Sequence, residues 1–132
     1  MRTLLLLDPD QARGHGVRQT LEALGYVVLV GHDVADAELR LREHSIDLVL
    51  VDQFLGGGMS AFAEMIRRLP EPMPFVMLSS SQTSPALSAR LGARALLLRP
   101  FSMGEIVEAL AIVIGPSELG EISTRRISTV AG

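Results

Sequence analysis

Short apolar runs alternate along the chain with segments in which apolar residues recur at helical spacing. The runs are rich in Leu and Val and do not alternate with polar residues, which is typical of strands covered on both faces. They predict strands at residues 3–7, 27–30, 48–51, 75–78 and 95–98. The segments between and after them predict helices at residues 11–24, 35–44, 60–69, 85–91 and 103–114.

This alternation indicates βα units that build one parallel sheet. We expect an α/β fold with a doubly wound, flavodoxin-like sheet of five strands in the order 2-1-3-4-5. Crossovers should be right-handed, with two helices on one face and three on the other. In the first helix Val17, Leu21 and Leu24 should face the sheet, and Gly25 should end the helix.

Composition narrows the class of protein. The chain has 132 residues, of which 48% are hydrophobic and 20% charged, so one ordered domain is expected at residues 1–115. Residues 116–132, rich in Ser, Thr, Gly and Glu, are predicted to be a flexible tail or linker stub. A net charge of −3 argues against direct nucleic-acid binding. Without Cys, a signal-peptide core or an apolar stretch of about 18 residues, the chain is predicted to be cytoplasmic, with no membrane span.

Polar residues stand at the ends of four predicted strands. Asp8, Asp52, Ser79 and Arg99 follow the first, third, fourth and fifth apolar runs. In the expected order the two aspartates end neighbouring strands, which lie about 5 Å apart. Such a carboxylate pair can bind magnesium, and a metal-supported carboxylate can attack phosphorus. A hydroxyl and a fixed cation would then bind the phosphoryl oxygens.

Each of these residues also has a simpler interpretation. Asp8 could cap the first helix, with Pro9 at its first position. Asp52 could form a turn before the glycines that follow it. Ser79 could belong to a polar loop, and Arg99 could be a solvated strand end.

The order and spacing of several segments resemble the receiver domain of two-component response regulators. They are the strand-end acid Asp8, the Leu-Gly-Tyr segment at residues 24–26, the run of residues 47–52 before a glycine-rich loop, the Leu-Gly-Ala turn at residues 91–93, and Arg-Pro-Phe at residues 99–101. The resemblance covers about residues 2–115. It implies a phosphorelay module that receives a phosphoryl group from a histidine kinase.

Carried over by position, the resemblance assigns roles to five residues. Asp52 is the phospho-acceptor, Asp8 is the first acid of the metal-binding pair, and the main-chain carbonyl of Phe54 completes the metal shell. Ser79 corresponds to the Ser/Thr switch and Arg99 to the invariant Lys, so both would contact the phosphoryl group.

The chain departs from the family pattern at three positions. Pro9 replaces the second acid of the pair, and the adjacent Asp10 is a poor substitute because it lies one residue further along. Arg99 replaces Lys, and a planar guanidinium does not fit a crowded site as an ammonium does. Leu96 stands where the family has an aromatic switch residue. Magnesium binding is therefore expected to be weak.

These departures favour an atypical receiver that works through protein interaction over a phosphorylated switch. Neither is an enzyme; the remaining alternative is a small flavodoxin-like enzyme or cofactor-binding domain that uses the strand-end crevice. The last helix has an apolar surface wider than a single stripe, with Val107, Ala111 and Ile114 on a second face. We expect this helix and the fifth strand to bind a signalling partner or a second copy of the chain.

Overall fold

The computed structural model describes residues 1–80 and 85–115. Within them, five parallel strands form one sheet in the order β2-β1-β3-β4-β5, as predicted. The strands are β1 (Thr3–Leu7), β2 (Val27–Gly31), β3 (Leu48–Asp52), β4 (Phe75–Ser79) and β5 (Ala95–Leu98). The helices are α1 (Gln11–Ala23), α2 (Val34–Glu43), α3 (Met59–Arg67), α4 (Pro85–Leu91) and α5 (Met103–Ile114).

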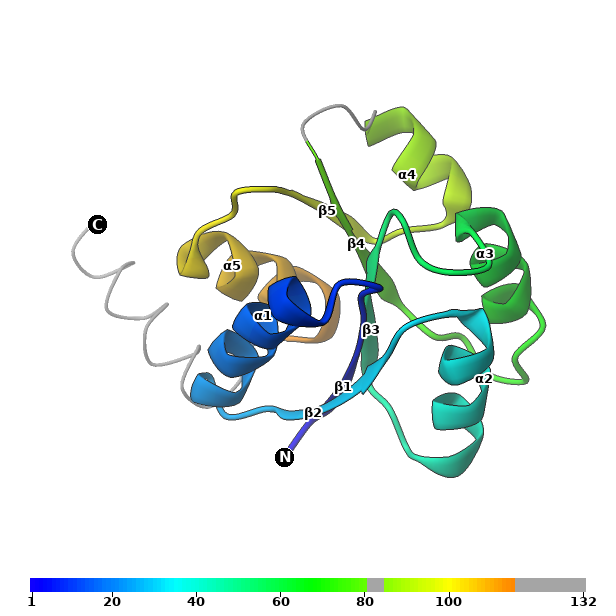
Figure 1. Cartoon of the computed structure of the whole chain (residues 1–132), viewed down its shortest axis with the longest axis horizontal. Coiled ribbons are helices and arrows are strands. Elements are labelled where there is room, and N and C mark those ends of the chain that lie inside the picture. Colours follow the sequence, from blue (N-terminus) through cyan, green and yellow to red (C-terminus); the bar gives the residue numbers. More distant parts are fainter. Residues whose placement is uncertain (81–84, 116–132) are drawn as a thin grey trace.

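Helices cover both faces of the sheet. In Figure 1, α1 and α5 lie on one side, and α2, α3 and α4 lie on the other. The predicted division into two and three helices is confirmed. The predicted tail at residues 116–132 lies outside the described residues. In the part of the chain that the structure describes, no helix combines the length and apolarity that a membrane span requires.

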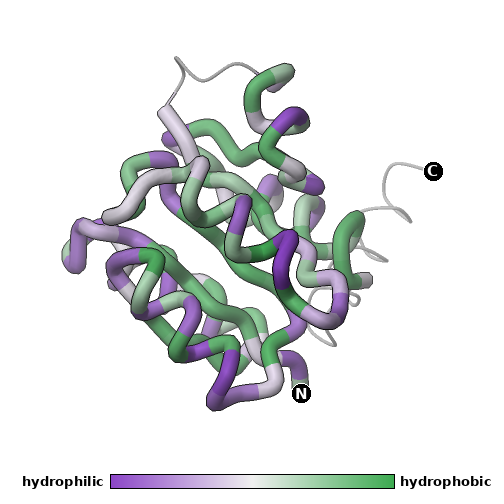
Figure 2. Tube along the Cα trace, turned by 90° about the vertical axis from the view of Figure 1, so that its right-hand side faces the viewer, coloured by the Kyte–Doolittle hydropathy of each residue, from purple (hydrophilic) through white to green (hydrophobic). Residues whose placement is uncertain are grey.

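The core consists of two apolar layers, one on each face of the sheet. Successive side chains of a strand point to opposite faces, so Leu4 and Leu6 join the layer under α1 and α5. Leu5 and Leu7 join the layer under α2 and α3. All four are essentially inaccessible, and burying each such side chain contributes about 1.5–3 kcal/mol. Figure 2 shows the hydrophobic colour concentrated along the strands.

The predicted inner face of α1 is confirmed, but its capping residue differs from the sequence interpretation. Val17, Leu21 and Leu24 are buried. Asp10 is the N-cap, and its side chain accepts a hydrogen bond from the Arg13 main-chain N–H at 3.1 Å. The capping interpretation of Asp8 is wrong. Gly25 has φ +95°, the left-handed conformation expected after the helix.

A tight glycine loop leads from β3 to α3. Gly57 has φ +94°, and a side chain there would put its Cβ 2.8 Å from Cγ2 of Val34. The Val34 N–H donates to the Gly56 carbonyl at 2.9 Å, which ties the loop to the start of α2. The loop therefore holds the end of β3, where Asp52 lies, in a defined position.

Candidate functional site

The two aspartates meet at the carboxyl edge of the sheet. Leu7 of β1 is in register with Val51 of β3, so the residues that follow, Asp8 and Asp52, are neighbours. Their exposed fractions are only 3% and 1%. Two buried carboxylates this close repel each other unless positive charge neutralises them.

Arg13 supplies part of this charge from α1. Its guanidinium makes a two-point contact with Asp8, from Nε to Oδ2 at 3.0 Å and from Nη2 to Oδ1 at 2.8 Å. The same Nη2 lies 3.4 Å from Oδ2 of Asp52. Hydrogen bonding to Asp8 raises the pKa of the Arg13 guanidinium, against an opposing effect of burial. Arg13 therefore remains charged.

Arg99 supplies the second positive charge from the end of β5. Its Nη2 lies 3.3 Å from Oδ2 of Asp8 and 3.3 Å from Oδ1 of Asp52, so one nitrogen bridges the pair. The guanidinium carbon also lies 5.3 Å from the centre of the Phe101 ring, within reach of a cation–π contact. The side chain is only 22% exposed, so the solvated strand-end interpretation of Arg99 is wrong.

Every oxygen of the acid pair has a protein partner. Oδ1 of Asp8 accepts from the Asp10 N–H at 2.8 Å and from Arg13, and its Oδ2 accepts from both arginines. Oδ1 of Asp52 accepts from Arg99, and its Oδ2 accepts from the Phe54 N–H at 2.9 Å and also lies near Arg13.

This donor set does not fit magnesium, which requires oxygen ligands directed at it. Two guanidinium groups already face the oxygens that would coordinate the ion. Among the described residues no group of three or more His, Asp or Glu side chains is arranged to hold a metal.

The other two predicted metal ligands, Asp10 and Phe54, make protein contacts of their own. Asp10 is exposed and caps α1, as described above. Phe54 reaches Asp52 through its N–H, while its side chain is 65% exposed. This N–H bond also shows that Asp52 makes the turn contact considered for it in the sequence.

Ser79 is fully buried at the end of β4, so the polar-loop interpretation is wrong. Its hydroxyl contacts Oε1 of Gln53, the residue after Asp52. The Ser80 N–H donates to the same oxygen at 2.6 Å. The Arg99 N–H donates to the Ser79 carbonyl at 2.8 Å, which joins the ends of β4 and β5.

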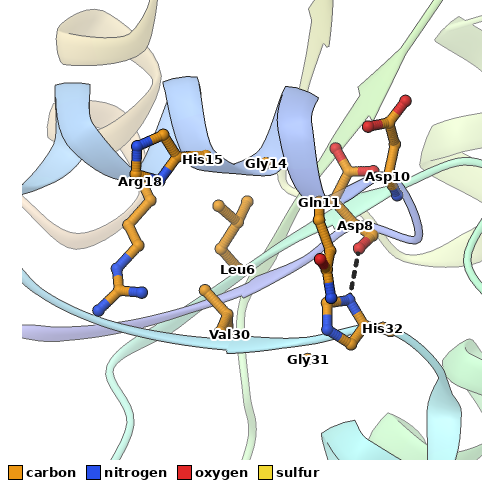
Figure 3. A pocket seen from close by; sticks show the side chains of 10 residues that line it. All are labelled: Leu6, Asp8, Asp10, Gln11, Gly14, His15, Arg18, Val30, Gly31 and His32. Carbon is orange, nitrogen blue, oxygen red and sulfur yellow. Dashed lines mark hydrogen bonds between the residues drawn. The ribbon is translucent and has the colours of Figure 1, made fainter.

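A cavity of about 250 Å³ lies between the start of α1 and β2, beside the acid pair. Its wall includes Asp8, Gly14 and His32 (Figure 3). The dashed line in Figure 3 marks the contact between Nδ1 of His32 and the Asp8 carbonyl, at 3.0 Å. This contact fixes the main chain of Asp8 from the side opposite Asp52.

Comparison with known proteins agrees with this fold. The family model of the response regulator receiver domain matches residues 4–111. The chain belongs to this family. The receiver domain is 30% identical over 123 residues to the transcriptional regulatory protein CpxR of Escherichia coli strain K12, covering 92% of this chain and 53% of that protein. CpxR of Klebsiella pneumoniae is 28% identical with the same coverage. The chain thus spans about half the length of these relatives.

Solved structures of receiver domains have the same fold. The non-phosphorylated HemR receiver domain from Leptospira biflexa superposes with a TM-score of 0.74 at 28% identity, covering 86% of this chain and 94% of that one. The chemotaxis response regulator CheY4 of Vibrio cholerae gives 0.77 at 23% identity, covering 86% and 99%. The receiver domain of the kinase PA1611 from Pseudomonas aeruginosa gives 0.78 at 21% identity, covering 86% and 98%; its structure has a magnesium ion coordinated in the active-site cleft.

Family membership favours the signalling interpretation over the flavodoxin-like enzyme. Receiver domains are modules of phosphorelay signalling that interact with histidine kinases and other signalling proteins, and they bind magnesium in their active site. Sequence reasoning missed two residues that contact the predicted site residues, Arg13 and Gln53. Arg13 follows the N-cap Asp10 by three residues, a spacing that predicts the first helical turn but not the direction of a long side chain.

Proposed function

We propose that this receiver domain signals through protein contacts and that phosphoryl transfer to Asp52 is impaired. The observation that carries the proposal is the occupation of all four Asp8 and Asp52 oxygens by protein donors, with two arginines facing the pair. The charges of the two acids and the two arginines cancel. Arginine therefore takes the role that a metal ion would have at this pair.

Transfer is expected to be impaired because the attacking carboxylate and the cation that would bind the phosphoryl group are already paired with each other. Attack on a phosphoryl group requires a carboxylate oxygen that can approach phosphorus and cations that can bind the equatorial oxygens. Here Arg99, which would contact the phosphoryl group together with Ser79, is paired with Asp8 and Asp52. Asp52 is the proposed acceptor for any residual transfer, and magnesium should bind weakly.

The proposed partner surface is formed by α5 and β5. Ile112 is 71% exposed and Leu98 is 37% exposed, whereas Val107, Ala111 and Ile114 are half-buried. A contiguous apolar patch on the surface is typical of a protein contact, and α5 packs beside β5, the edge strand of the sheet. We propose that this surface binds a second copy of the chain or another signalling protein, such as a histidine kinase. Neither enzymatic activity nor direct nucleic-acid binding is part of the proposal.

Intact mass measurement after incubation with acetyl phosphate and magnesium tests the impairment. Wild-type protein should show no added phosphoryl group under conditions that label a phosphorylation-competent receiver domain in parallel. The Asp52→Asn variant controls for labelling elsewhere. Rapid, magnesium-dependent labelling of wild type that Asp52→Asn abolishes would overturn the proposal.

A further inference from the structure

Two hydrogen-bond donors at the end of β4 converge on one side-chain oxygen of Gln53. They are the Ser79 hydroxyl and the Ser80 main-chain N–H. Because a main-chain N–H can only donate, the Gln53 atom that faces it must be the carbonyl oxygen. The Ser79 hydroxyl must then donate its proton to that oxygen as well.

This oxygen accepts hydrogen bonds from a hydroxyl and a main-chain N–H, as a phosphoryl oxygen can. Gln53 follows Asp52 directly, and its N–H donates to the Leu78 carbonyl at 2.9 Å, which fixes the main chain between β3 and β4. The Ser79 hydroxyl has a single proton to donate, and Ser79 is fully buried. A phosphoryl group on Asp52 would therefore have to compete with Gln53 for this donor.

We infer that Gln53 is a positioning residue that holds the end of β4 in place of a phosphoryl group. The inference rests on the proposed function, in which phosphoryl transfer to Asp52 is impaired. Hydrogen bonds link Gln53 to Ser79, Ser79 to the main chain of Arg99, and the Arg99 side chain to Asp8 and Asp52. The ends of β1, β3, β4 and β5 thus form one connected network.

This network reaches the proposed partner surface. The Ser79 carbonyl accepts from the Arg99 N–H directly after β5, the strand that contributes Leu98 to that surface. Gln53 is therefore expected to set the relative position of the β4 and β5 ends without any modification of Asp52. In this receiver domain Gln53 supplies the hydrogen-bond acceptor that phosphoryl transfer to Asp52 would otherwise add.

Amide hydrogen exchange measured by NMR on the full chain, without any phosphodonor, tests the inference. Gln53→Met keeps the side-chain length and removes the acceptor, so exchange at the Ser80 amide should accelerate about tenfold, the effect of losing one hydrogen bond of ordinary net strength. Gln53→Glu retains an acceptor oxygen and should keep the Ser80 amide near its wild-type rate. Gln19→Met, on the exposed side of α1, is the matched control and should change nothing at Ser80.

The Val76 amide, inside β4, separates a local effect from general destabilisation. It should exchange at the wild-type rate in Gln53→Met. The inference would be overturned if the Ser80 rate in Gln53→Met were unchanged or if the Val76 amide accelerated equally. It would also be overturned if the Ser80 amide lost its protection in Gln53→Glu. The phosphodonor experiment can fail while this one succeeds, because labelling of Asp52 does not alter exchange in unlabelled protein.

Discussion

Replacing Arg99 by Met should destabilise the fold because it leaves two buried carboxylates with one arginine. Met retains an apolar chain against Phe101 but has no charge. At 3.3 Å and an effective dielectric constant of ~20, each contact of Nη2 with Asp8 or Asp52 corresponds to about 5 kcal/mol of Coulomb energy. The cost of desolvating the guanidinium offsets a large part of this energy.

Breaking a buried ion pair typically costs about 3–5 kcal/mol. Because Arg99 is 22% exposed and Arg13 stays in place, we expect a loss at the lower end, about 3 kcal/mol. With a urea m-value of about 2 kcal/mol/M, the unfolding midpoint should fall by about 1.5 M. Circular dichroism during urea unfolding measures this shift.

The matched control for this experiment is Arg42→Met. Arg42 pairs with Glu38 at 2.6 Å on the surface of α2, where its side chain is 74% exposed. Exposed pairs of this kind contribute about 0.5 kcal/mol or less, so the midpoint should barely move. In the Arg99→Met background, Asp52→Asn should restore part of the lost stability because it removes one of the two repelling charges. An Arg99→Met midpoint as close to wild type as that of Arg42→Met would refute the reasoning.

Three further predictions concern the surroundings of the site. Gly57→Ala should lower the free energy of unfolding by about 2 kcal/mol because Gly57 has a positive φ and a Cβ there would contact Val34. Gly104→Ala in α5 is the control and should raise the free energy of unfolding by about 0.5 kcal/mol. Urea unfolding measures both changes. Asp10→Ala should cost about 1 kcal/mol through loss of the N-cap, and stability retained in this variant would contradict a capping role. Where wild type forms dimers in light scattering, Ile112→Glu should abolish them without changing the circular dichroism spectrum. Dimers that persist in the variant would exclude this surface.

The fold could be predicted from the sequence because its strands are short, apolar and covered on both faces. Such runs stand out against the helical spacing between them, and β1, β5, α4 and α5 have the predicted bounds. The remaining elements differ by one or two residues at one end or, in α2 and α3, at both ends. At the start of α1, Asp8 and Asp10 are both able to cap, and only the direction of the chain after Pro9 distinguishes them.

The site could be predicted only in part. Asp8, Asp52, Ser79 and Arg99 were found because strand ends in a parallel sheet meet at one edge. The contribution of Arg13 depends on how a long side chain turns back across the helix start, which residue spacing does not determine. The role of Gln53 depends on the turn after β3 directing its amide toward β4. Both residues act through side-chain direction rather than through position in a strand.

The most direct test of the central claim, that arginines occupy the place of a metal ion, is calorimetric titration of magnesium into the wild-type receiver domain. Arg13→Ala serves as the comparison because it removes one positive charge and one donor from both oxygens of Asp8 and from Oδ2 of Asp52. Asp52→Asn controls for binding elsewhere. We predict no saturable binding to wild type at millimolar magnesium and measurable binding to Arg13→Ala. The account would be contradicted if wild type bound magnesium as tightly as Arg13→Ala does and if Asp52→Asn abolished that binding.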